Sequence, residues 1–318
     1  MPASMCGLPE FTLTVSKGND MAKGSTRTNA STLPRRALGR QLRKLRERAG
    51  YTQSAASRVA EISPQSYGRI EDGWQTKVTD LGLNALADAY EATDEERRLL
   101  LDLAREIREA GASGSGWWRA FADAFDSGFD HFLSLEEAAS GVTTWQTAVV
   151  PGLLQTRDYR QALTWANLPD QSPEEVNRGL DLALRRQGHL DRPGFRLEAL
   201  LAESVLRYTV GSSTVMAEQV KLLLERSELP NVEIRVVPNS VTRPVGLVSR
   251  SFHIFTFPPL HPSKLQEPPV VYMEGFTGNL YVERDIEVAQ YSRETDRIRQ
   301  VALSPAASRD LMLRIAKE

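Results

Sequence analysis

The strongest constraint on this chain is a dense series of helix start and stop signals between Arg35 and Ile107. The first run carries one apolar stripe at helical spacing, which ends before Gly50: Leu38, Leu42, Leu45 and Ala49. A capping residue precedes each later run: Thr52, Ser63, Thr79 and Thr93. The pattern predicts one all-α domain of five helices over residues 34–110.

The second and third of these helices have helix-turn-helix spacing. The helix after Thr52 is short, Glu61 and Ile62 form a turn, and Ser63-Pro64 opens the next helix. In this motif the N-terminal half of the second helix enters the major groove of DNA. Residues 64–72 are therefore the predicted recognition helix.

Polar side chains around this motif suit contacts with DNA. Gln53 lies at a helix N-terminus, where it can meet a phosphate, and Lys77 can reach another phosphate. On the recognition helix, Gln65, Ser66 and Arg69 share a face that suits base edges. The full predicted contact set is Thr52, Gln53, Ser63, Gln65, Ser66, Arg69 and Lys77.

The charge distribution agrees with a nucleic-acid-binding segment. Residues 21–80 hold 12 Lys and Arg against 5 Asp and Glu, a net of +7. The whole chain carries −2 and residues 1–20 carry −1, so residues 81–318 carry −8. A basic segment joined to an acidic body is typical of a nucleic-acid-binding protein. A solvated helix face, or a helical module that docks proteins, would give similar charges.

The segment TQSAASRVAEISPQSYGRIEDG, residues 52–73, resembles the lambda-repressor/Cro-like (Xre) helix-turn-helix family. The family shares its Thr-Gln start, its Ser-Pro before the recognition helix and its Arg-Ile-Glu-x-Gly end, and the similarity covers residues 37–73. The resemblance implies a structural ion pair between Arg46 and Glu71. Glu61 departs from the family, which often has glycine in this turn; a residue other than glycine costs about 1 kcal/mol at positive φ.

The composition outside the helical domain predicts the other boundaries. Residues 1–33 are rich in Gly, Ser, Thr and Asn and predict a disordered tail, within which Met21 is a candidate start codon. Residues 111–116 have the composition of a flexible linker. Residues 117–318 predict a mixed α+β regulatory or partner-binding domain, with helices after Ser172 and Ser304 and strands near 195–201, 232–236, 251–257, 270–274 and 280–283.

This second domain resembles an actinobacterial, antitoxin-like domain of unknown function from about Phe132 to the C-terminus. The similar segments are TAVVPGLLQTRDY at 147–159, AESVLRY at 202–208, ELPNVEIRVV at 228–237 and VYMEGFTGNLY at 271–281. The resemblance implies a transcription regulator, often paired with a small protein encoded nearby. It implies no catalytic or ligand-binding residues.

Residue types that would indicate catalysis or a cofactor are sparse. The chain has one cysteine, Cys6, and four histidines outside any metal-ligand spacing: His131, His189, His253 and His261. It has no GxSxG, P-loop or GxGxxG motif. We therefore expect no enzyme activity, metal or cofactor. The absence of a long apolar run predicts no membrane span, and we expect a cytoplasmic, nucleoid-associated protein.

Three functional hypotheses remain. The first is a sequence-specific regulator that binds double-stranded operator DNA as a homodimer, under the control of its C-terminal domain. The second is an antitoxin-like protein that binds a small cognate protein and autoregulates its operon. The third is an enzyme within residues 117–318, which would need convergent acid, base or metal groups in a pocket.

Overall fold

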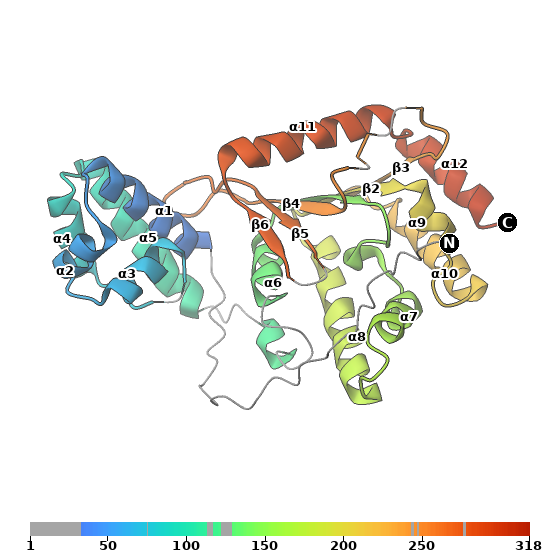
Figure 1. Cartoon of the computed structure of the whole chain (residues 1–318), viewed down its shortest axis with the longest axis horizontal. Coiled ribbons are helices and arrows are strands. Elements are labelled where there is room, and N and C mark those ends of the chain that lie inside the picture. Colours follow the sequence, from blue (N-terminus) through green and yellow to red (C-terminus); the bar gives the residue numbers. More distant parts are fainter. Residues whose placement is uncertain are drawn as a thin grey trace, which may run out of the picture.

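The chain forms a helical N-terminal domain and a mixed α+β C-terminal domain, as predicted (Figure 1). The computed structural model describes residues 33–74, 76–112, 117–121, 129–242, 245–246, 248–275 and 278–318. Of the predicted tail, residues 1–32 lie outside this described part. Leu33 does not belong to a tail, because it begins the first helix and its side chain is buried.

The N-terminal domain consists of five helices in the described part: α1 (Leu33–Arg48), α2 (Gln53–Val59), α3 (Pro64–Glu71), α4 (Asp80–Ala89) and α5 (Asp94–Ala112). The side chains of Thr52, Ser63 and Thr79 cap α2, α3 and α4. Thr93 and Glu96 form a reciprocal capping box at α5.

The predicted linker begins too early. Helix α5 continues through Gly111 and Ala112, while residues 113–116 lie outside the described part. A helix accommodates a glycine at a cost of about 1 kcal/mol, so composition alone placed this boundary wrongly.

Helices α1 and α3 approach each other closely at Gly39. A Cβ atom added at Gly39 would lie 2.4 Å from the carbonyl oxygen of Ile70 and 2.5 Å from that of Glu71. The missing side chain therefore lets α1 pack directly against the end of α3. Tyr67 and Tyr90 are buried in the core of the same domain, and their hydroxyl groups are hydrogen-bonded to each other at 2.7 Å.

The C-terminal domain is built on a six-stranded sheet of order β3-β2-β1-β4-β5-β6. Its strands are β1 (Gly141–Gln146), β2 (Arg196–Ala202), β3 (Val232–Val237), β4 (Phe252–Thr256), β5 (Val270–Met273) and β6 (Leu280–Val282). Strands β1, β2 and β3 are parallel, whereas β4, β5 and β6 are joined by antiparallel pairing. The five predicted strands are present, and β1 is an additional strand near the middle of the sheet.

Helices cover both faces of this sheet. They are η1 (Trp117–Phe121), α6 (Phe129–Ala138), η2 (Gly152–Leu154), α7 (Arg157–Asn167), α8 (Pro173–Gln187), η3 (Gly188–Asp191), α9 (Glu203–Arg207), α10 (Ser213–Arg226), α11 (Asp285–Val301) and α12 (Pro305–Ile315). Figure 1 shows α11 across one side of the sheet and α6 and α8 on the other.

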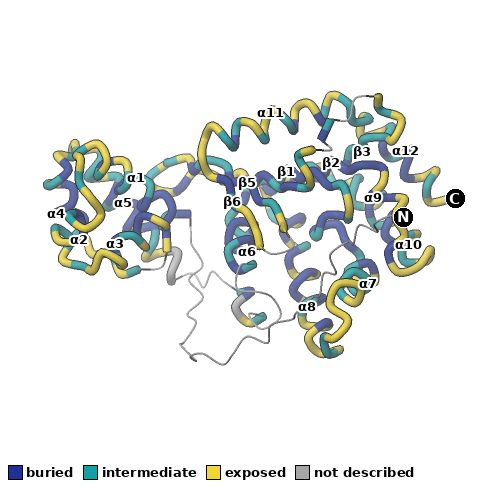
Figure 2. Tube along the Cα trace, in the orientation of Figure 1, coloured by how far each residue is buried: buried dark blue, intermediate teal, exposed yellow. Residues whose placement is uncertain are grey.

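Most of the buried apolar residues form one cluster that runs through both domains. Figure 2 shows buried segments along the strands and on the inner sides of α1 and α5. The two domains therefore pack against each other as well as being joined by the chain.

Candidate nucleic-acid interface

The turn between α2 and α3 holds the two helices in helix-turn-helix geometry. Ser63 accepts a hydrogen bond from the backbone N–H of Ser66 at 3.1 Å, which fixes the start of α3. Glu61, at the predicted turn, has φ = 54° and so adopts the left-handed conformation that glycine usually provides. The turn keeps this geometry without a glycine.

The outer face of α3 carries side chains free to meet a ligand. Gln65 and Arg69 are exposed, and within the described residues no carboxylate pairs with the guanidinium of Arg69. Lys77, beyond the end of α3, is likewise exposed and without an ion-pair partner in this part of the chain. These three side chains can donate hydrogen bonds to bases or phosphates without first breaking an internal ion pair.

The other predicted contact residues already have internal partners. Ser66 is half-buried, and its hydroxyl lies 2.8 Å from the hydroxyl of Ser63. Thr52 accepts the backbone N–H of Ala55 at 3.1 Å. Gln53 donates from Nε2 to Oε2 of Glu71 at 2.8 Å. These side chains therefore hold the two helix N-termini in place, and any contact with DNA would be additional.

Arg46 and Glu71 form the ion pair that the family resemblance implies. Nε of Arg46 lies 2.6 Å from Oε1 of Glu71, and Nη2 lies 3.1 Å from Oε2. The Glu71 side chain is fully buried. Burial raises the pKa of Glu71, but the hydrogen bonds from Arg46 and Gln53 outweigh it and hold the pKa below its usual value. Glu71 therefore stays ionised and joins the ends of α1, α2 and α3.

Most of the basic residues on α1 are occupied by internal ion pairs. Arg43 pairs with Asp72 at 2.6 Å, and Arg48 pairs with Glu96 at 2.6 Å. Two more α1 arginines pair with the C-terminal domain. Much of the net positive charge of residues 21–80 is therefore paired internally, and charge patterning does not identify the carboxylate partners of these arginines.

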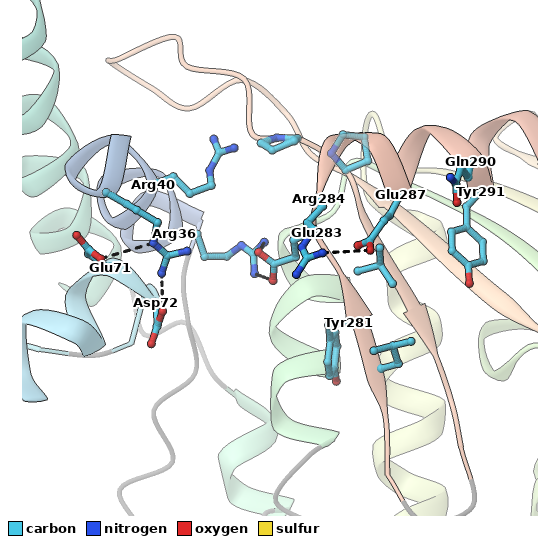
Figure 3. A pocket seen from close by; sticks show the side chains of 15 residues that line it. Arg36, Arg40, Glu71, Asp72, Tyr281, Glu283, Arg284, Glu287, Gln290 and Tyr291 are labelled. Atoms are coloured by element: carbon cyan, nitrogen blue, oxygen red, sulfur yellow. Dashed lines mark hydrogen bonds and ion pairs between the residues drawn. The ribbon is translucent and has the colours of Figure 1, made fainter. Parts of the chain in front are cut away.

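A groove of about 810 Å³ separates the N-terminal domain from strand β6 and helix α11 (Figure 3). Arg36 spans it to Glu283 with two contacts of 2.8 Å, and Nη2 of Arg40 lies 2.7 Å from Oε1 of Glu267. The partners are more than 220 residues apart in sequence, and sequence analysis missed them.

The C-terminal domain also buries an ion pair between α6 and α8. Glu136 accepts two hydrogen bonds from Arg186, at 2.7 and 2.9 Å, and both side chains are almost fully buried. Burial lowers the pKa of the neighbouring His253 to about 4, so this imidazole is neutral near pH 7. In the described part no three His, Cys, Asp or Glu side chains cluster as metal ligands would.

Comparison with known families identifies both domains. The model of a helix-turn-helix domain matches residues 37–100, and the model of a domain of unknown function, DUF5753, matches residues 129–314. No curated protein and no solved structure matches the chain. Among the helices in the described part, none is both long and apolar enough to cross a membrane.

Proposed function

Because the chain belongs to the DUF5753 family and carries a helix-turn-helix domain ahead of it, we propose that it is a sequence-specific transcription regulator of the Xre type. The observation that supports this proposal most directly is the exposed outer face of α3. Gln65 and Arg69 are exposed there, while Glu71 fixes the end of the same helix to α1. A rigid helix with free amide and guanidinium groups suits the reading of base edges in a major groove.

In this proposal two copies place their α3 helices in successive major grooves of a palindromic operator. The C-terminal domain controls occupancy, and the packing between the domains supports such control. No enzymatic step is included, since binding alone accounts for the regulator activity. An antitoxin-like role, in which the C-terminal domain neutralises a small partner protein, is the second candidate and rests on the family resemblance.

The experiment is a binding titration of the full chain on DNA from upstream of its own gene, against a scrambled duplex, at several salt concentrations. The wild type should prefer the upstream DNA, and its affinity should fall as salt rises. Arg69→Ala should weaken binding by about 1–3 kcal/mol and relax the preference at one base position.

Lys77→Ala is the matched control, because Lys77 is also exposed and cationic but lies beyond the recognition helix. Its loss should weaken both duplexes equally and reduce the salt slope by about 1. An equal loss on both duplexes for Arg69→Ala would reassign Arg69 to a phosphate. If the wild type shows no preference even at low salt, the proposal fails.

A further inference from the structure

The two domains are joined by polar contacts that the proposed function does not use. Arg36 meets Glu283 and Arg40 meets Glu267, both across the domain boundary. A third contact runs from the backbone N–H of Ser263 to Oε1 of Glu106 on α5, at 2.8 Å. The C-terminal domain therefore contacts α1 and α5 with specific geometry.

The arginines of these contacts belong to a stripe on α1. Arg36, Arg40, Arg43 and Arg46 follow at spacings of four, three and three residues, which places them along one side of the helix. The first two pair with the C-terminal domain, and the last two pair with Glu71 and Asp72 at the end of α3. One side of α1 thus connects the C-terminal domain to the recognition helix (Figure 3).

The contact between the two domains leaves some buried polar atoms without a hydrogen-bond partner. Within the described residues, Nε of Arg36, Nε of Arg40 and Oε2 of Glu267 are buried and have no hydrogen-bond partner. Unpaired buried polar atoms oppose docking. Burial also raises the pKa of Glu267, which indicates that its ion pair does not fully offset the loss of water. These unpaired atoms reduce the net contribution of the polar contacts to docking.

Docking also changes the charge beside the recognition helix. Residues 113–318 carry a net charge of −4. Glu283 and Glu287 line the same groove as Asp72, which caps the end of α3. Docking thus brings a domain of net negative charge close to α3, and its repulsion of DNA phosphates would weaken binding.

We propose that the Arg36–Glu283 and Arg40–Glu267 pairs form an autoinhibitory latch, which holds the acidic C-terminal domain against the DNA-binding domain. This inference rests on the proposed function. A signal received by the C-terminal domain would open the latch and raise affinity for the operator.

The test is a charge-swap cycle in the full chain: Glu283→Arg, Arg36→Glu and the double variant that exchanges the two charges. Glu283 is 44% exposed, so its reversal can be accommodated by the C-terminal domain alone. Two readouts are measured, namely the radius of gyration by small-angle scattering and the affinity for operator DNA. Thermal melting checks that each variant is folded.

Glu283→Arg should increase the radius of gyration and tighten operator binding by roughly 5- to 150-fold, the usual range of coupling between sites. The double variant should return both values toward the wild type, and it keeps the test valid if Arg36→Glu alone does not fold. Glu287→Arg is the matched control, since it changes the same charge in the same groove but pairs with Arg284 of its own domain.

Unchanged or weaker operator binding by Glu283→Arg would overturn the latch. So would an equal gain in Glu287→Arg, or a double variant that keeps the gain. If no variant distinguishes operator from scrambled DNA, the proposed function fails instead. The scattering data then still decide whether these pairs hold the domains together.

Discussion

Replacing Glu71 with alanine tests whether the end of the recognition helix depends on one buried carboxylate. Glu71 accepts two hydrogen bonds from Arg46 and one from Gln53, and its side chain has no exposed surface. Removing one partner of a buried ion pair typically costs about 3–5 kcal/mol, because the remaining charge stays buried without compensation. Arg46 keeps its bond to the carbonyl oxygen of Tyr51, so we expect the lower half of this range.

The assay is calorimetric melting of the full-length variant. A domain of 60–100 residues loses about 4–8 °C of melting temperature per kcal/mol, so a loss of about 3–4 kcal/mol in Glu71→Ala should lower the N-terminal transition by roughly 12–32 °C. Operator binding should disappear over the same temperature interval, because α3 is no longer anchored.

Asp72→Ala is the matched control for this experiment. Asp72 is the next residue, is also acidic and pairs with Arg43, but its side chain is 55% exposed. Exposed pairs contribute only about 0–1 kcal/mol, so this variant should melt close to the wild type. Equal, small shifts for both substitutions would refute the assignment of Glu71 as the anchor of the motif.

Two further predictions concern packing and acid stability. Gly39→Ala should destabilise the N-terminal domain, since its Cβ would meet the Ile70 carbonyl at 2.4 Å, whereas Gly179→Ala on α8 has open space and should stabilise by about 0.5–1 kcal/mol; urea unfolding of both variants measures the contrast. The free energy of unfolding should also fall as the pH drops from 6.5 towards 4. Burial lowers the pKa of His131 and His253 from 6.5 to about 4, so the unfolded chain binds more protons in this window and stability rises with pH. His253→Gln should flatten this dependence, and an unchanged slope would show that His253 is solvated.

Local sequence patterns predict most of the helices and strands. The caps at Thr52, Ser63 and Thr79 depend on hydrogen bonds that span only three residues, so sequence spacing predicts them directly. Strand β3 and the first half of β2 alternate apolar and polar side chains, which also marks them in sequence.

Strand β1 shows where the local pattern fails. Its sequence, GVTTWQ, contains only two large apolar side chains, yet Thr144 and Gln146 are buried with Trp145. Thr144 donates to the carbonyl oxygen of Phe252, more than a hundred residues away, and Gln146 donates to Thr144. Polar residues can occupy a central strand when distant partners satisfy them, and sequence alone does not reveal those partners.

The charged residues show the same difference between what local sequence predicts and what depends on distant partners. The sequence by itself determined the helix-turn-helix, the two domains and the exposed Gln65, Arg69 and Lys77, because each depends on neighbours within one or two turns. Only the tertiary structure decided that Arg36 and Arg40 of α1 pair internally, since Glu283 and Glu267 reach them from the other domain. Ion pairs between distant segments require the folded arrangement of both, and composition reports only the total charge.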